Sequence, residues 1–157
     1  MPNNYLLFAE SWDLEPKCVE WLQRFLDGCR EDPEAIPKEV AQVLEGTVGY
    51  DAAVEDAAIT VNAMFSLNGP DGNLYVYAEE SGDVELVGRV LYEMLKAAGS
   101  DQILALEWAE TCSRGRPGEF GGGVLVVSRE GTDYETTGEM RQRLERKIQR
   151  KRAKRNR

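Results

Sequence analysis

Charge divides this chain into two parts with different folding prospects. The last eighteen residues, Met140 to Arg157, contain ten Lys or Arg and one acid, Glu145, for a net charge of +9. The other 139 residues contain 27 acids and nine bases, for a net charge of −18. The basic segment has one narrow apolar stripe, so it can add little to a hydrophobic core. The acidic part must therefore build the fold. The asymmetry also indicates a charged partner, or a tail that docks on its own body.

Length and composition predict a single globular domain. A chain of 157 residues with 42% apolar and 30% charged residues can bury a sizeable core. Residues 1–4 have neither the basic nor the apolar region of a signal peptide. No apolar run approaches the roughly 20 residues that cross a bilayer. We therefore expect a cytoplasmic protein without membrane contact. It should have an acidic α+β domain at residues 1–137 and a basic helix or tail at residues 138–157.

The cysteine and histidine content excludes several kinds of chemistry. The three cysteines, Cys18, Cys29 and Cys112, are odd in number and lack the C-x-x-C spacing. This indicates reduced thiols rather than a disulfide framework. The chain contains no histidine. Catalysis by Ser-His-Asp or Cys-His groups and histidine-based zinc sites are thus excluded within one chain.

Hydrophobic periodicity predicts the elements of the first half. Residues 5–9 read as a short buried strand and residues 16–30 as an amphipathic helix with Pro16 in its first turn. Residues 36–44 predict a second short helix, and residues 47–56 a loop. Residues 59–67 alternate between apolar and polar side chains, which predicts a strand with one buried face.

The second half reads as a hairpin, a helix and further strands. A dense turn signal at residues 68–72 predicts that the strand at 74–79 pairs with the preceding one. A helix over 84–98 should begin after the N-cap Asp83 and end before Gly99. Strands are expected at residues 103–109 and 124–128. Glu130-Gly131 reads as a turn.

The last helix should open with the capping box Thr136-x-x-Glu139. Its apolar stripe consists of Met140, Leu144 and Ile148. Beyond the stripe the segment has nothing to bury, so residues 149–157 should fray unless a partner holds them.

The order of elements predicts a fold class. Its core reads βαββαβ, the split βαβ plan of a ferredoxin-like sandwich, with an extra strand and a C-terminal basic helix. An internal similarity supports this reading, since residues 4–10 resemble residues 73–79, and an acidic turn and an amphipathic helix follow each.

Carboxylates at the ends of strands suggest a cation site. If the first and third strands run parallel, Glu10 and Glu79 lie at the same sheet end near Asp83, whereas Glu110 lies at the opposite end. Mg²⁺ and Ca²⁺ prefer carboxylate oxygens, and paired carboxylates also serve acid/base catalysis. The alternative is that acids favour strand exits and helix N-termini for their own stability. Two further acids would join this rim, Asp13 and Glu80.

The glycine-rich segment at residues 111–123 is the most unusual local feature. A hairpin loop of this length is often functional, and its glycines permit close backbone approach. No helix follows the glycines, so the phosphate-binding logic of a P-loop is absent. Gly121–Gly123 read as a bulged strand entry. The candidate partner-binding side chains of this loop are Arg114, Arg116, Glu119 and Phe120.

Aromatic residues allow a second kind of ligand to be considered. Side chains such as Tyr75, Tyr77 and Trp108 can stack nucleobases when they lie on a sheet face. The strongly acidic body would repel a phosphate backbone, however. We therefore expect Trp108 and Tyr75 to pack in the core or at an interface.

The basic tail offers candidate contacts for nucleic acid. Arg150, Lys151 and Arg152 belong to its densest basic run, which could contact phosphates. Three apolar residues are too few to anchor the helix on a membrane. The alternatives are that the tail solubilises the protein or docks on its own acidic body.

Three stretches resemble a family of uncharacterised small proteins of bacteria, plasmids and phages. They are residues 74–83 (LYVYAEESGD), 106–113 (LEWAETCS) and 118–127 (GEFGGGVLVV), and the opening Met-Pro-Asn is similar too. The resemblance covers residues 70–130 well and residues 1–70 loosely. It implies a phage or mobile-element setting and no particular chemistry. The family has Arg-Val-Gly-Glu-Phe where this chain has Arg-Pro-Gly-Glu-Phe at 116–120, and the basic tail is peculiar to this chain.

These observations support three hypotheses. The first is a non-enzymatic acidic binding protein whose carboxylates imitate phosphate and inhibit a nucleic-acid-binding host protein. The second is a nucleic-acid-associated protein that works through its tail. The third is an enzyme that depends on a divalent cation or on Glu10, Glu79 and Asp83; the other two need no cofactor. A homodimer through an open sheet edge is compatible with all three.

Overall fold

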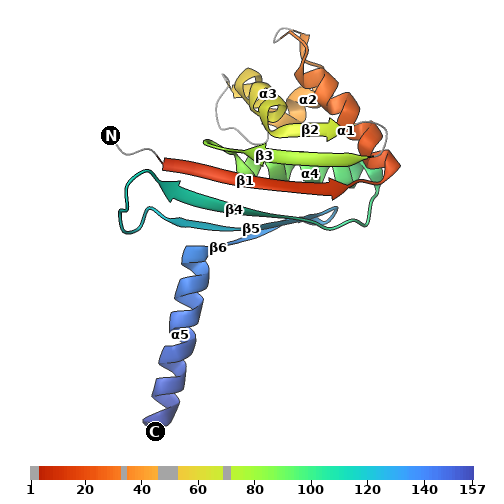
Figure 1. Ribbon diagram of the computed structural model, residues 1–157. Coiled ribbons are helices and arrows are strands. Elements are labelled where there is room, and N and C mark those ends of the chain that lie inside the picture. Colours follow the sequence, from red (N-terminus) through yellow and green to blue (C-terminus); the bar gives the residue numbers. More distant parts are fainter. Residues whose placement is uncertain (1–3, 33–34, 46–52, 69–71) are drawn as a thin grey trace.

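The computed structural model describes residues 4–32, 35–45, 53–68 and 72–157. Within these ranges the protein is an α+β fold with one six-stranded antiparallel sheet and five helices. Figure 1 shows helices packed against the sheet and a last helix, α5, that projects away from it. The acidic part of the chain forms the layered body, as its apolar content predicts.

The sheet has the strand order β2-β3-β1-β4-β5-β6. Every described pair of neighbouring strands is antiparallel. The long strand β1 links the two halves, since its first residues pair with β4 and its last residues pair with β3. The strands are β1 (Asn4–Asp13), β2 (Phe65–Asn68), β3 (Asn73–Ala78), β4 (Leu104–Cys112), β5 (Gly121–Ser128) and β6 (Gly131–Thr136).

Four helices cover one face of the sheet, and the fifth follows the last strand. The helices are α1 (Pro16–Cys29), α2 (Lys38–Glu45), α3 (Ala53–Met64), α4 (Val84–Ala98) and α5 (Thr137–Arg155). The predicted caps of α4 are confirmed. Asp83 accepts a hydrogen bond from the Leu86 amide at 3.0 Å, and Gly99 ends the helix with a φ of 62°.

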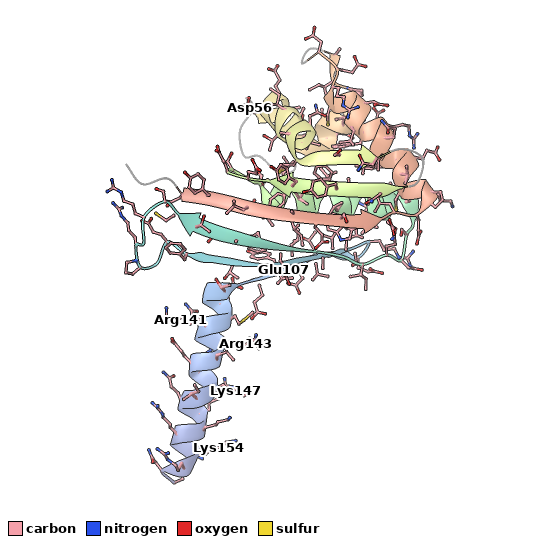
Figure 2. The ribbon with its side chains drawn as sticks, viewed as in Figure 1. Asp56, Glu107, Arg141, Arg143, Lys147 and Lys154 are labelled. Atoms are coloured by element: carbon pink, nitrogen blue, oxygen red, sulfur yellow. The ribbon has the colours of Figure 1, made fainter. Side chains whose placement is uncertain are left out.

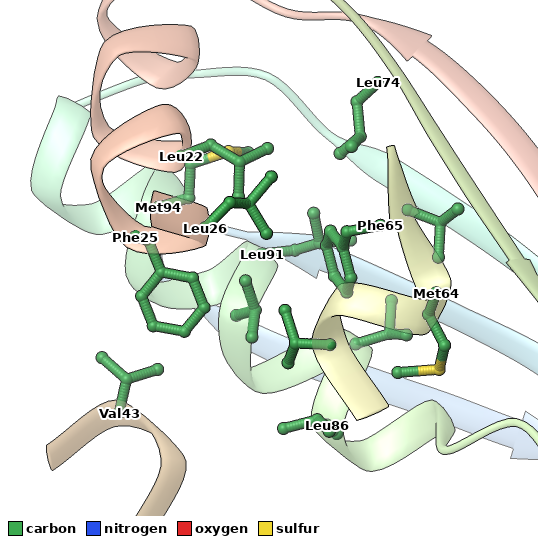
Figure 3. Close-up of a cluster of buried hydrophobic side chains, with 14 of the residues drawn as sticks. Leu22, Phe25, Leu26, Val43, Met64, Phe65, Leu74, Leu86, Leu91 and Met94 are labelled. Carbon is green, nitrogen blue, oxygen red and sulfur yellow. The ribbon is translucent and has the colours of Figure 1, made fainter. Parts of the chain in front are cut away.

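One continuous core holds the body together. Strands β1 to β5 contribute side chains to it from one face, such as Leu74 and Val76 from β3 and Leu104 and Leu106 from β4. Helical residues such as Leu91 fill the space above them, and Figure 3 shows how closely these side chains pack. The opposite sheet face contributes none of these core residues. Helices thus cover one side of the sheet and leave the other open.

The predicted strand at residues 59–67 is wrong over most of its length. The chain is helical to Met64 in α3, and only Phe65–Asn68 is strand. The alternating pattern also fits a helix, because Ala57, Val61 and Met64 are all buried at helical spacing whereas Ile59 is 65% exposed. The alanine-rich sequence favours a helix as well.

The predicted loop at residues 47–56 also needs correction. Residues 53–56 belong to α3, whereas residues 46–52 lie outside the described part of the chain. Of the predicted turn at 68–72, residues 69–71 lie outside it too. Gly72 has the positive φ of 75° that such a turn requires.

The glycine-rich segment is shorter as a loop than the sequence suggests. β4 continues to Cys112 and β5 begins at Gly121, so only residues 113–120 connect them. The predicted bulge at Gly121–Gly123 is wrong, because these glycines pair in continuous register with β4. A Cβ at Gly123 would collide with the Trp108 indole, and a Cβ at Gly122 with the Trp108 carbonyl. The glycines therefore make room for Trp108.

Strand β6 was not predicted. It pairs with β5 from Ser128 to Gly123 and forms one edge of the sheet. Its sequence contains only one large apolar residue, Tyr134, which explains the weak signal. β6 ends at Thr136, which is also the N-cap of α5, so no linker separates strand from helix.

The capping box of α5 is confirmed. The Thr136 hydroxyl accepts a hydrogen bond from the Glu139 amide at 3.1 Å, and the Thr136 amide donates to the Glu139 carboxylate at 3.4 Å. The helix continues to Arg155, beyond the point at which we expected it to fray. Its arginine, lysine and glutamine side chains are good helix formers, which favours this continuation. In the described part of the chain, no helix is long and apolar enough to span a membrane.

Candidate binding surfaces

Exposed carboxylates gather on the helices that follow β1. Residues 13–56 contain twelve acids and four bases. The described members on α1–α3 and their connections project into solvent, and Figure 2 shows Asp56 on the outer side of α3. We call this surface the acidic helical face. Its carboxylates are those of Glu20, Asp27, Glu31, Asp32, Glu39, Glu45, Glu55 and Asp56.

A cleft opens within this acidic helical face. It has a volume of about 690 Å³ and lies between α1, α2 and α4. Trp21 and Phe25 line it and stack with their ring centroids 5.1 Å apart. Glu39 lies on its wall. The cleft therefore joins an aromatic surface to side chains of both charges, an arrangement that suits a large apolar or aromatic side chain of a protein partner. Its other charged lining residues are Arg24, Arg89 and Glu93.

The basic residues of α5 project from the opposite part of the molecule. No residue of α5 is buried. Helical spacing brings five basic side chains to one side, and Figure 2 shows three of them, Arg143, Lys147 and Lys154, on the side opposite Arg141. We call this row the basic ridge. It consists of Arg143, Arg146, Lys147, Arg150 and Lys154.

The residues that the sequence singled out on the tail do not form one surface. Arg150, Lys151 and Arg152 are all exposed on α5. Consecutive helical residues point about 100° apart, so Arg150 joins the basic ridge while Arg152 points away from it. Helical geometry, once α5 is known to be continuous, is what selects the ridge.

One ion pair links the start of α5 to the sheet, and a second lies within the helix. The Arg143 guanidinium lies 3.0 Å from the Glu135 carboxylate on β6, and the Arg141 guanidinium lies 3.0 Å from Glu145 one turn along the helix. Figure 1 shows α5 leaving the sheet at the β6 edge, on the side opposite α1–α3. The molecule thus separates a negative helical layer from a positive helix.

The strand arrangement behind the predicted cation site is wrong. β1 and β3 are antiparallel, with Glu10 opposite Val76 and Asp13 opposite Asn73. Glu79 lies three residues beyond Val76, so it is displaced from Glu10 by ~10 Å along the sheet. No group of three or more acidic or thiol side chains among the described residues could hold a metal ion.

The acids at the other end of β1 also differ from expectation. Glu110 pairs with Leu6, and the Leu6 amide donates a 2.8 Å hydrogen bond to the Glu80 carbonyl. Glu110 therefore lies at the same end as Glu79 and Glu80, and it is Glu10 that lies away from them along β1. Asp83 is engaged at this end as the N-cap of α4.

The loop at residues 113–120 brings its four candidate residues together only in part. The guanidinium of Arg116 lies 3.8 Å from the Glu119 carboxylate, so this pair is internal to the loop. Phe120 is 55% exposed, and Arg114 is exposed as well. The loop thus presents the exposed ring of Phe120 and an arginine, Arg116, that is already paired within the loop. It lies at the end of the sheet near Cys112.

The open sheet face carries a pair of stacked tyrosines. The rings of Tyr75 and Tyr77 lie 5.8 Å apart at 20°, and Tyr75 is 40% exposed. A hydrogen bond to Glu79, more than burial, raises the pKa of Tyr77 to about 12. Of the two expected places for Tyr75, the core is excluded and an interface stays a prediction, whereas Trp108 packs, partly buried, against the core.

A second cleft lies beside α4, above the β4–β6 part of the sheet. Its volume is about 660 Å³, and its floor contains the apolar side chains of Leu6, Trp108 and Leu125. Gly88 leaves space along its wall, where an added Cβ would meet Leu125 at 3.3 Å. No pattern in the sequence indicated this cleft, because it depends on the unpredicted strand β6. We call it the acidic cleft, since three carboxylates line it against one base, Arg89, which pairs with Glu93 at 3.4 Å. The three carboxylates are those of Asp83, Glu85 and Glu110.

The cysteines offer little chemistry. All three are free thiols, and Cys18 and Cys29 are buried in the core. Burial raises the pKa of the Cys29 thiol to about 12 and raises that of Cys18 as well. Both therefore remain protonated thiols at neutral pH, which makes them poor nucleophiles.

Comparison of the chain with protein-family models, with curated proteins and with solved structures finds no match. The family resemblance of residues 70–130 therefore stays a prediction, and the functional argument must start from the surfaces themselves.

Proposed function

We propose that the protein is a non-enzymatic binding protein whose acidic helical face captures a basic, nucleic-acid-binding protein. The observation that carries this proposal is the concentration of exposed carboxylates on α1–α3, away from the basic helix. A surface with this charge attracts partners that normally bind phosphate, and it speeds their association.

The cleft between α1, α2 and α4 supports the same proposal. Carboxylates alone give fast association but modest affinity, because exposed ion pairs contribute little. Buried aromatic or arginine anchors supply most of the affinity in protein interfaces. The Trp21 ring, which stacks on the buried Phe25 ring, offers such an anchoring site, with Glu39 beside it. A side chain of the partner could pack on the Trp21 ring, with the carboxylates and arginines of the cleft as its polar neighbours.

A second candidate function rests on the basic ridge of α5. Residues 143, 147, 150 and 154 repeat at helical spacing over ~16 Å, without any burial that would explain them. Such a row can bind a nucleic-acid backbone with strong salt dependence. This function needs only α5, whereas the first needs only the body, so the two separate cleanly.

A capture experiment distinguishes the two. The full chain and a chain that ends at Thr137 are immobilised and exposed to host lysate, with and without nuclease. We expect both chains to retain the same basic protein, and the retention to survive nuclease. Retention that requires α5 and disappears with nuclease would contradict the first proposal and support the second.

We also propose two finer assignments. The order β2-β3-β1-β4, with α4 joining β3 to β4, supports the ferredoxin-like plan for this part of the sheet. A phage or mobile-element origin, which the resemblance implies, fits a small inhibitor of a host protein. An experimental structure of the chain tests the first assignment, and the genomic neighbourhood of the gene tests the second.

A further inference from the structure

We propose that α5 of one copy of this chain binds in the acidic cleft of a second copy, and that two copies exchange helices in this way. This interface is independent of the capture function, because it uses neither the acidic helical face nor the cleft on it. Two surfaces of the same chain carry the inference, and each lacks a partner within the copy described.

The first surface is the apolar stripe of α5. Met140, Leu144 and Ile148 lie one turn apart on one side of the helix and are 36%, 49% and 51% exposed. The basic ridge lies on a different side, whereas Lys151 and Arg155 continue the line of the stripe toward the C-terminus. A helix of this kind lays its apolar side into a groove while its charged neighbours meet the rim.

The second surface is the acidic cleft. Its floor provides apolar and aromatic side chains from Leu6, Trp108 and Leu125, and Tyr134 of β6, 60% exposed, stands at its edge. The carboxylates of Glu85 and Glu110 line it in exposed positions. The cleft therefore complements an apolar stripe flanked by bases, both in polarity and in charge.

A helix cannot reach the cleft of its own copy without breaking its start. Thr136 ends β6 and caps α5 at once, and the pair between Arg143 and Glu135 fixes the direction of the helix. Figure 1 shows α5 projecting beyond the β6 edge, away from the body. Cleft and helix both lie at this edge, so a two-fold axis beside β6 would seat both helices at the same time.

Pairing of two α5 helices with each other is the weaker alternative. Each helix carries nine bases and two acids, so two helices side by side would repel one another. The acidic cleft replaces this repulsion with attraction. The exchange also leaves the basic ridge facing solvent.

The test measures self-association of the full, nuclease-treated chain by sedimentation equilibrium. We expect a dimer at micromolar concentration. The stripe variant Leu144→Asp/Ile148→Asp should be monomeric. The cleft variant Glu85→Lys/Glu110→Lys should dissociate about tenfold or more readily, because like charges then face each other. Addition of Lys151→Glu and Arg155→Glu to the cleft variant should recover much of the lost association.

A matched control keeps the test specific. Ile59 and Ile103 are 65% and 70% exposed outside both surfaces, so the variant Ile59→Asp/Ile103→Asp should dimerise like the unchanged chain. A monomeric unchanged chain overturns the proposal, and so does a stripe variant that still dimerises. A cleft variant that associates normally overturns it too, since the contact would then be helix with helix or edge with edge. Failure of the combined variant to recover association also counts against it.

Discussion

The body and α5 are stabilised in opposite ways. In the body, the helices and one sheet face share a continuous apolar core, in which Leu22, Leu91 and Met94 are at most 1% exposed. In α5 no residue is buried, and the helix is held by a capping box, two ion pairs and its intrinsic propensity. Burial contributes kilocalories per side chain, whereas these local terms contribute tenths to about one. A helix that adds so little to the fold is free to make contacts outside it.

The largest expected difference between the two regions follows from the core. Leu91→Ala should lower the free energy of unfolding by about 2–5 kcal/mol, because it leaves a cavity among closely packed side chains. Removal of α5, in a chain that ends at Thr137, should change it by less than ~0.5 kcal/mol. Urea unfolding followed by the tryptophans, all in the body, measures both at concentrations where the chain is monomeric. Comparable losses for the two changes would show that α5 belongs to the cooperative core.

A somewhat smaller effect is expected at the glycines of β5. Gly122→Ala or Gly123→Ala should destabilise the body by about 1–3 kcal/mol, because the added methyl group meets Trp108. Gly115→Ala is the control, since nothing lies within 4 Å of its added Cβ. Thermal unfolding measures all three. Equal stability of all three variants would contradict the explanation that Trp108 requires glycine at these positions of β5.

The N-caps of α4 and α5 allow the same kind of substitution to be compared in the body and in the last helix. Asp83→Ala removes the N-cap of α4 and should cost the body about 1 kcal/mol. Thr136→Ala removes the same kind of bond from α5, and it should reduce the helicity of residues 137–155 without moving the global transition. Urea unfolding measures the first effect and amide chemical shifts of α5 the second. A global destabilisation by Thr136→Ala would mean that the helix supports the sheet.

The smallest effect concerns the open sheet face. The hydrogen bond to Glu79 raises the folded pKa of Tyr77 to about 12, above its usual value of 10.0. The stabilisation that this bond provides is therefore fully present below pH 10 and is lost as the pH rises toward 12. Ultraviolet titration should show one phenol ionising late, and Glu79→Gln should move it toward pH 10. Truncation at Thr137 should leave this titration unchanged.

The sequence predicted those elements in which local and tertiary signals agree. The caps of α4, the capping box of α5 and the buried stripe of α1 are each fixed by a few neighbouring residues. Residues 59–64 were predicted as a strand because their pattern of apolar residues fits both a strand and a helix. Only packing against the core selects the helix. β6 was not predicted because it is an edge strand with only one large apolar side chain, so its sequence pattern for a strand is weak.

Surfaces that depend on strand register could not be read from the sequence. The acids at Glu10 and Glu79 were expected together because a parallel pairing was assumed, and the antiparallel register separates them. The acidic cleft requires β6, which the pattern did not reveal. The basic ridge follows from helical geometry alone, so of these surfaces it is the one that the sequence predicted most nearly. Net charge by segment was readable at once, since it depends on no contact at all.

The most direct test of the central claim is charge reversal on the body. The variant Glu20→Lys/Glu39→Lys/Glu55→Lys changes the acidic helical face, whereas the control Glu80→Lys/Glu107→Lys/Asp133→Lys makes the same change of charge away from it. All six positions are exposed, so both variants should fold. The affinity for the captured basic protein should fall at least about tenfold in the first and little in the control. Equal losses of affinity in both variants would mean that only the net charge of the protein matters. Unchanged capture by the first variant would contradict the account.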